Sequence, residues 1–286
     1  GCEFMRDGSE GLVYDVVEGW GPLPEGWELG MALAVAMDSR DRVYVFCRGT
    51  HPVVVFDRDG GVLDSWGDGV FTTPHYIEID RHDHVWCTDS GDHTVRKFTT
   101  EGELLLTLGV KDVPGEEGAP FNRPTGTFLL PSGEFYVADG YVNSRVHKYS
   151  ADCELEFSWG GPGDGPGEFD IPHGVWVEGD RFYVADRQNN RIQVFTLGGE
   201  YLEEWGDLLQ PCNVYIAGGR FYVPELQGRV SILDGDGGLL TRLGGERGHE
   251  PGEFYAPHGV YVDSNGDLYV AETLAGARVQ KFVLRD

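Results

Sequence analysis

Three histidines occupy the same local setting, at the start of three segments in which apolar and polar residues alternate. They are His75 in TPHYIEI, His173 in IPHGVWV and His258 in APHGVYV, and the chain has only nine histidines. Three histidines with an open fourth position form a catalytic zinc site, whereas a lone histidine inside a fold is more often a polar residue bonded to water. The choice between these interpretations depends on whether the fold brings the three side chains to one point.

The segments around these histidines belong to a unit that repeats six times. Each unit contains four short apolar runs separated by Gly and Asp turns, a pattern of β-strands at the spacing of about 40–50 residues typical of propeller blades. The most regular run is the second of each unit: VYVFC (43–47), VWCTD (85–89), FYVAD (135–139), FYVAD (182–186), FYVPE (221–225) and LYVAE (268–272). The sequence therefore predicts an all-β, six-bladed β-propeller that forms a single domain over residues 1–286.

The two ends of the chain are expected to meet in the last blade. The sixth repeat stops at Asp286 before its outer strand, and VYDVVEGWG (13–21) resembles the missing strand. We therefore expect residues 12–21 to hold the strand that closes the last blade, which removes free sheet edges. We interpret residues 1–4, which precede Met5, as a remnant of cloning.

The propeller geometry gives the three histidines a common position. The first strand of each blade lines the central channel, so equivalent residues form a ring at one depth. Aligned on the turn before this strand, the ring is Leu33, His75, Thr125, His173, Cys212 and His258. Histidine occupies every second blade, about 120° apart in a six-fold arrangement. We therefore predict that His75, His173 and His258 converge on one metal ion, while the three intervening residues keep the gaps narrow.

A second ring follows the second strands and carries two arginines. Its members are Arg48, Ser90, Gly140, Arg187, Leu226 and Thr273. Guanidinium groups bind carboxylates through two parallel hydrogen bonds, so Arg48 and Arg187 near a metal predict an anionic substrate. The alternative is a pair of structural ion pairs, a role that we expect instead for Arg145 and Arg191 in the third strands.

Tyr141, in ADGYVNSR, follows the third blade's second strand and is expected at the same mouth of the channel. A tyrosine beside a metal and two guanidiniums can have a lowered pKa and act as a base; the alternative is an ordinary packed tyrosine.

An acid ends the second strand in five of the six repeats: Asp89, Asp139, Asp186, Glu225 and Glu272. We expect these acids to bond turn amides or the next blade, with one or two of them supporting the metal histidines.

Composition limits the classes of partner. With 22 basic and 48 acidic residues the net charge is −26, so the chain lacks the cations with which proteins neutralise nucleic acids or anionic membranes. No apolar run approaches the ~20 residues of a spanning helix. Five irregularly spaced cysteines do not predict a disulfide framework. We expect a soluble monomer with neither nucleic acid nor membrane as a partner; a secreted and a cytoplasmic location both remain open.

Two resemblances add to these observations. The F-x-x-P motifs before four first strands (Phe71–Pro74, Phe121–Pro124, Phe169–Pro172 and Phe254–Pro257) resemble NHL repeats. VADGYVNSRVHKY, YVADRQNNRIQVF and YVFCRGTH resemble the catalytic core of peptidyl-α-hydroxyglycine α-amidating lyase, a six-bladed propeller with a three-histidine zinc site. The likeness extends over all six blades. It implies that His75, His173 and His258 are the zinc ligands, Tyr141 the catalytic tyrosine, and Arg48 and Arg187 the active-site arginines.

Four positions depart from the lyase pattern. Val142 and Val184 stand where the family has disulfide cysteines, and Gly126 stands where it has an aspartate. Gly259 replaces the aspartate that helps to bind the family's structural calcium, which argues against a calcium site. The departures affect the scaffold more than the chemistry, and they suggest a distant, microbial relative.

The resemblance implies a zinc-dependent lyase that cleaves an N-acyl α-hydroxyglycine, a small-molecule or peptide-derived anion, to an amide and glyoxylate. Iron or manganese can also occupy three histidines. Two other functions remain open: a metal-dependent hydrolase of esters, lactones or phosphoesters that uses the same site, and a non-catalytic NHL binding propeller.

Overall fold

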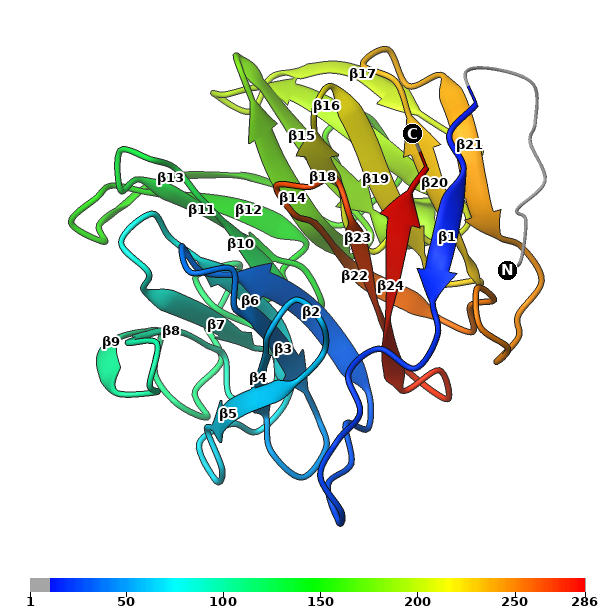
Figure 1. Cartoon of the computed structure of the whole chain (residues 1–286). Helices are drawn as coiled ribbons and strands as arrows, with labels where there is room; N and C mark the ends of the chain where they lie inside the picture. The colour runs from blue at the N-terminus through cyan, green and yellow to red at the C-terminus, as the bar shows by residue number, and fades with distance from the viewer. Residues whose placement is uncertain (1–10, 286) are drawn as a thin grey trace.

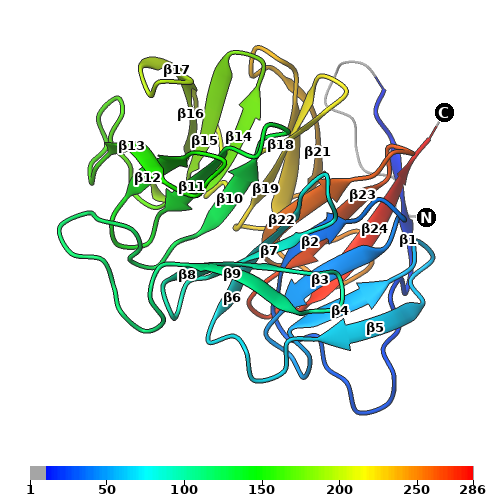
Figure 2. The ribbon, with the colours of Figure 1, turned by 90° about the vertical axis from the view of Figure 1, so that its left-hand side faces the viewer.

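A computed structural model describes residues 11–285, so the predicted cloning remnant at residues 1–4 lies outside the described residues. Apart from one 3-10 turn, η1 (Arg187–Asn189), every regular element in the described part of the chain is a β-strand. The strands form six antiparallel sheets of four strands each (Figure 1 and Figure 2). This arrangement confirms the predicted all-β, six-bladed propeller.

Each sheet is a blade, and its four strands lie side by side in order from the channel axis to the outside of the molecule. The innermost strands are β2 (Ala32–Met37), β6 (Pro74–Ile79), β10 (Gly126–Leu129), β14 (Pro172–Glu178), β18 (Tyr215–Ala217) and β22 (Pro257–Val262). The second strands are β3 (Val43–Cys47), β7 (Val85–Asp89), β11 (Phe135–Asp139), β15 (Arg181–Asp186), β19 (Arg220–Glu225) and β23 (Leu268–Glu272). The third strands are β4 (Val53–Phe56), β8 (Thr94–Phe98), β12 (Arg145–Tyr149), β16 (Arg191–Thr196), β20 (Arg229–Leu233) and β24 (Arg278–Leu284). The outer strands are β5 (Val62–Trp66), β9 (Leu104–Leu108), β13 (Leu155–Gly160), β17 (Tyr201–Trp205), β21 (Leu239–Gly244) and β1 (Tyr14–Val17).

The core lies between neighbouring blades. Successive side chains of a strand point to opposite faces of its sheet, and here both faces are covered by the next blades. Second strands such as β3 and β11 are therefore buried at every position and read as continuous apolar runs. The innermost strands contact one another in order around the axis, and β2 contacts β22, so the ring is closed.

The N-terminal strand closes the last blade, as the repeat pattern predicted. β1 pairs with β24 in antiparallel register, from Tyr14 opposite Leu284 to Val17 opposite Lys281, and the two strands lie side by side in Figure 1. The strand is shorter than the predicted segment 12–21. It ends before Gly19 and Gly21, whose positive φ angles of 70° and 79° are incompatible with a continued strand.

Tyr14→Ala is expected to lower the free energy of unfolding by about 3–5 kcal/mol, as for other large aromatic side chains deleted from a core. Tyr14 is fully buried and packs in the cluster formed by the fifth and sixth blades. Urea denaturation checks this value. Val17→Ala on the same strand is the control, because Val17 is 37% exposed and its loss should change stability by less than about 0.5 kcal/mol. Equal effects of the two substitutions would contradict the role of β1 as a closing strand.

The five acids at the ends of the second strands are structural. All five are fully buried. Each accepts a hydrogen bond from a backbone N–H of the connection that enters its own blade: Thr72 to Asp89, Asn122 to Asp139, Asp170 to Asp186, Leu209 to Glu225 and Tyr255 to Glu272. The prediction that these acids bond turn amides is confirmed.

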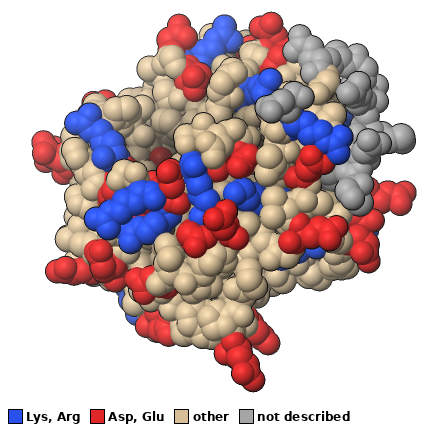
Figure 3. All heavy atoms as spheres, in the orientation of Figure 1, with Lys and Arg blue, Asp and Glu red and all other residues tan. Residues whose placement is uncertain are grey.

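Charged side chains of both signs share the surface. On the face shown in Figure 3, Lys and Arg side chains lie interspersed with Asp and Glu side chains. Exposed ion pairs of this kind include Arg181 with Glu203 and Arg285 with Asp15. No helix within residues 11–285 is long and apolar enough to cross a membrane.

Candidate metal centre

The three histidines lie at irregularities in the innermost strands. His75, His173 and His258 are the second residues of β6, β14 and β22. In each strand the register with the second strand shifts at this residue, so the histidine has no partner opposite it. A β-bulge of this kind redirects a side chain, and here it lets an imidazole point toward the channel axis.

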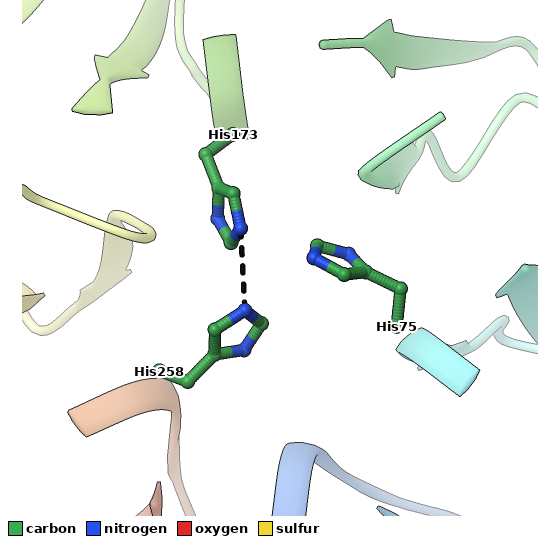
Figure 4. A group of neighbouring side chains, drawn as sticks. All are labelled: His75, His173 and His258. Carbon is green, nitrogen blue, oxygen red and sulfur yellow. Dashed lines mark hydrogen bonds between the residues drawn. The ribbon is translucent and has the colours of Figure 1, made fainter. Parts of the chain in front are cut away.

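The three imidazoles converge on one point. Figure 4 shows the rings of His75, His173 and His258 facing one another from three sides. Their ring centroids lie 4.6 to 4.9 Å apart, and the ligand nitrogens all lie within 4.8 Å of one another. The Nε2 atoms of His173 and His258 are 3.2 Å apart. The structure therefore brings together the histidines that the alternation of blades predicted.

Backbone carbonyls fix the orientation of all three rings. The Nδ1 atoms of His75, His173 and His258 lie 2.5, 2.5 and 2.7 Å from the carbonyl oxygens of Thr125, Cys212 and Leu33. Each Nδ1–H thus donates to the equivalent residue of the next blade, which leaves the Nε2 lone pairs directed at the centre. Sequence pattern predicted only that Leu33, Thr125 and Cys212 keep the gaps narrow, and the role of their carbonyl groups was not predicted. The prediction that one or two of the strand-end acids support the histidines is wrong, because backbone oxygens occupy that position.

Burial keeps the histidines neutral, as ligands must be. Desolvation lowers the pKa of His258 to about 3, and it lowers the pKa of His75 and His173 well below the usual value. Zinc–nitrogen bonds of about 2.0–2.1 Å in a tetrahedral site separate two ligand nitrogens by about 3.3–3.4 Å. The 3.2 Å between Nε2 of His173 and His258 is close to this spacing. The histidine nitrogens are therefore placed where they could hold one metal ion.

Tyr141 lies beside the histidine cluster. Its hydroxyl oxygen is 3.0 Å from Nε2 of His75 and 3.4 Å from Nε2 of His173. The tyrosine is held there because it follows the end of β11 and because its backbone N–H donates to the backbone carbonyl of Arg123 at 3.2 Å. The second strand is antiparallel to the innermost one, so the end of β11 lies next to the level at which the innermost strands begin.

Arg48 and Arg187 come from equivalent turns at the same end of the channel. The guanidinium carbon of Arg187 lies 5.5 Å from the centre of the Tyr141 ring. Nε–H of Arg48 donates to the carbonyl of Pro74, the residue before His75, at 3.0 Å. The structure thus places all six predicted site residues around one mouth.

Neither Arg48 nor Arg187 forms an ion pair with a carboxylate within residues 11–285. The alternative interpretation, in which these two arginines form structural ion pairs, is therefore removed. Arg191, by contrast, pairs with Asp186 at 2.8 Å, as expected for a third-strand arginine. The same expectation for Arg145 is wrong. Its blade's acid, Asp139, bonds His147 at 2.8 Å instead, and Arg145 has no ion pair with a described residue. The mouth therefore carries two positive charges free for a ligand.

The environment of Tyr141 changes its pKa in two directions. Burial raises the pKa, and the positive charges of Arg187 and Arg48 oppose that rise. The effect of burial is larger, so the pKa of Tyr141 is raised. The protein's own groups therefore do not produce the lowered pKa that the sequence suggested. The hydroxyl is therefore a proton donor to the histidine nitrogens unless another cation is present.

The structure also accounts for one departure from the lyase pattern. A Cβ on Gly259 would lie 2.5 Å from the carbonyl oxygen of Leu33, which already accepts the bond from His258. An aspartate cannot be accommodated there without a backbone shift. Cys47, Cys87, Cys153 and Cys212 are all free, so the cysteines within the described range form no disulfide.

Comparison with known proteins agrees with the architecture. The model of the NHL repeat matches residues 121–149, 169–195 and 254–282, which include Tyr141, His173 and His258. Human NHL repeat-containing protein 3 is 32% identical over 308 residues, covering 96% of this chain and 85% of that protein. A probable peptidyl-α-hydroxyglycine α-amidating lyase of Caenorhabditis elegans is 36% identical over 169 residues, covering 57% of this chain and 47% of the relative.

Among solved structures, a gluconolactonase from Xanthomonas campestris superposes with a TM-score of 0.70 at 14% identity, covering 96% of this chain and 90% of that one. At 14% identity, this match supports a shared fold and nothing about function. The matched repeats, the six blades and the homologues named as amidating lyases lead to one assignment. The chain belongs to the NHL-repeat family of six-bladed β-propellers, and its relatives include peptidyl-α-hydroxyglycine α-amidating lyases.

Proposed function

We propose that this protein is a metal-dependent lyase, with zinc as the metal, that cleaves N-acyl α-hydroxyglycines to an amide and glyoxylate. One observation carries the proposal: the hydroxyl of Tyr141 lies 3.0 Å from Nε2 of His75, at a mouth lined by two arginines that have no carboxylate partner among the described residues. A metal-ligand cluster, a proton-transfer group and a double positive charge are the parts that this reaction needs on a carboxylate substrate. The named lyases among the relatives support the assignment.

The residues divide the work as follows. Arg48 and Arg187 bind the substrate carboxylate and orient the α-carbon toward the histidines. A divalent metal bound by the three histidines would acidify the α-hydroxyl. Tyr141, as the phenolate, accepts the hydroxyl proton while the oxygen electron pair forms the aldehyde C=O. The C–N bond breaks, its electron pair passes to nitrogen, and the proton returns from Tyr141 to the departing amide.

The direct test is an assay of the metal-loaded protein with an N-acyl α-hydroxyglycine, in which glyoxylate and the amide are measured together. Equimolar formation of the two products, lost on chelation and restored by zinc, is the expected result. Ester, lactone and phosphotriester substrates are run beside it. Turnover of those alone would replace the proposal with a hydrolase, and metal binding without any turnover would favour a binding propeller.

Arg187→Gln is expected to raise KM for the α-hydroxyglycine by about 10–100-fold, because truncating one partner of a charge-assisted contact costs roughly 2 kcal/mol or more. Arg187→Lys should recover only part of the loss, since an ammonium lacks the paired donors of a guanidinium. Steady-state kinetics check both variants. Arg181→Gln in the same blade, which breaks an exposed pair with Glu203, is the control and should leave KM unchanged. An unchanged KM in Arg187→Gln would remove this arginine from the substrate site.

A further inference from the structure

A cavity lies in the central channel, farther along the innermost strands than His75, His173 and His258. It measures about 200 Å³ and is lined by residues of all six innermost strands. The six residues of the innermost strands at the level of the histidines are each followed, three positions later, by a residue that lines this cavity. These six lining residues are Ala36, Glu78, Phe128, Trp176, Tyr215 and Tyr261. With a rise of about 3.3 Å per residue, they lie roughly 10 Å along the strands from the histidines. The cavity is thus separate from the candidate metal centre.

Four aromatic side chains form a continuous wall around this cavity. The ring centroids of Phe128 and Trp176 are 4.8 Å apart, those of Trp176 and Tyr215 are 4.6 Å apart, and those of Tyr215 and Tyr261 are 5.2 Å apart. Neighbouring rings are tilted by 56° to 62°. Such a wall surrounds the cavity over four consecutive blades. Tyr76 adds a fifth aromatic side chain to the lining.

Glu78 is the one carboxylate in the lining. One oxygen accepts from the Leu129 N–H at 2.7 Å and the other from the Thr127 hydroxyl at 2.8 Å. These two bonds leave acceptor positions unused, because a carboxylate offers about four. No lysine, arginine or histidine of the described chain forms an ion pair with it. A partly buried carboxyl group with no cationic partner among the described residues therefore faces the aromatic cavity, and it carries a negative charge once it is ionised.

We propose that this cavity binds a small organic cation, an alkylated ammonium group, with Glu78 as its counter-ion and the aromatic rings packed against its methyl groups. Aromatic faces attract such cations, and sites for quaternary ammonium ions are commonly built from several aromatic side chains. The volume is below the ~300 Å³ at which pockets for larger ligands begin, so a head group fits rather than an extended molecule. The net charge of −26 also concentrates cations near the protein.

The test compares choline with 3,3-dimethylbutan-1-ol, which has the same shape without the charge, by isothermal titration calorimetry on the metal-loaded protein at pH 9, where Glu78 is ionised. Choline is expected to bind at least tenfold more tightly than the neutral alcohol. Equal binding of the two probes would show an apolar cavity without cation selectivity. No binding of choline would overturn the proposal outright.

Two variants assign the binding to named groups. Glu78→Gln is expected to weaken choline binding at least tenfold while the metal content stays at the wild-type level, which shows that the propeller is folded. Trp176→Leu, which keeps an apolar wall, should weaken choline but not the alcohol. Glu103→Gln removes one exposed charge from the outer strand region and is the matched control, with unchanged affinity expected. Full choline affinity in Glu78→Gln would reject this residue as the counter-ion.

The affinity should also depend on pH. Burial, with the nearby charge of Asp80, raises the pKa of Glu78 to about 8 despite the two hydrogen bonds that it accepts. Burial also raises the pKa of Tyr76, Tyr215 and Tyr261, so these groups stay protonated, and the other lining side chains do not titrate. Choline, whose charge is fixed, requires ionised Glu78, so its affinity should rise about tenfold between pH 7 and pH 9. A constant affinity over this range in the wild type would contradict the role of Glu78.

Discussion

His173→Ala is expected to abolish metal retention, from about one ion per chain to near zero after dialysis, and to abolish turnover with it. His173 supplies one of three nitrogens within 4.8 Å of one another, and its Nε2 is 3.2 Å from that of His258. Loss of a group that only orients a ligand costs about 10–100-fold in metal affinity, so loss of a ligand should cost at least two orders of magnitude. Elemental analysis and titration against a chromophoric chelator measure the change.

The control for this substitution is His249→Ala. His249 is exposed and stacks on Tyr255, away from the cluster, so its loss should leave one ion bound. Thermal unfolding of the variants separates metal loss from misfolding, because His173→Ala leaves the Cys212 carbonyl without its donor. A full complement of metal in His173→Ala, or no metal in the wild type under zinc-replete conditions, would contradict the metal centre.

Tyr141→Phe is expected to lower kcat by about 10²–10⁴-fold, the range attributed to a positioned general acid or base, while metal stays bound. The substitution removes the hydroxyl that lies 3.0 Å from Nε2 of His75 and keeps the ring against which Arg187 lies. KM should change little, since the carboxylate contacts belong to the arginines. Single-turnover measurement of glyoxylate formation, paired with metal analysis, distinguishes loss of chemistry from loss of the ion.

Tyr201→Phe is the matched control for this variant. Tyr201 is 37% exposed on an outer strand, and removal of its hydroxyl should leave kcat unchanged. Full turnover by Tyr141→Phe would reject the proton-transfer role. Simultaneous loss of metal and activity would instead make Tyr141 a residue that holds the histidines in place.

The architecture is readable from the sequence because each blade repeats the same short-range pattern. Runs such as FYVAD at 135–139 end at the same residues as strand β11, since a short apolar run and the turn that follows it are both local properties. The closure of the ring is also readable, because a sixth repeat without an outer strand needs the segment around Tyr14. Alternation of histidine between blades then placed His75, His173 and His258 on one axis.

What the sequence determined about this protein is therefore the number of blades, their closure, and which side chains share one depth of the channel. The tertiary structure alone decided how those side chains are held. The carbonyl oxygens of Thr125, Cys212 and Leu33 hold the imidazoles, and the bulges point them inward. It also decided that Arg145 and Asp139 do not pair, and that Glu78 faces an aromatic cavity with no ion-pair partner within residues 11–285. These features arise between blades, where the contacts join residues far apart in the chain, such as His258 and Leu33, and no local pattern encodes such contacts.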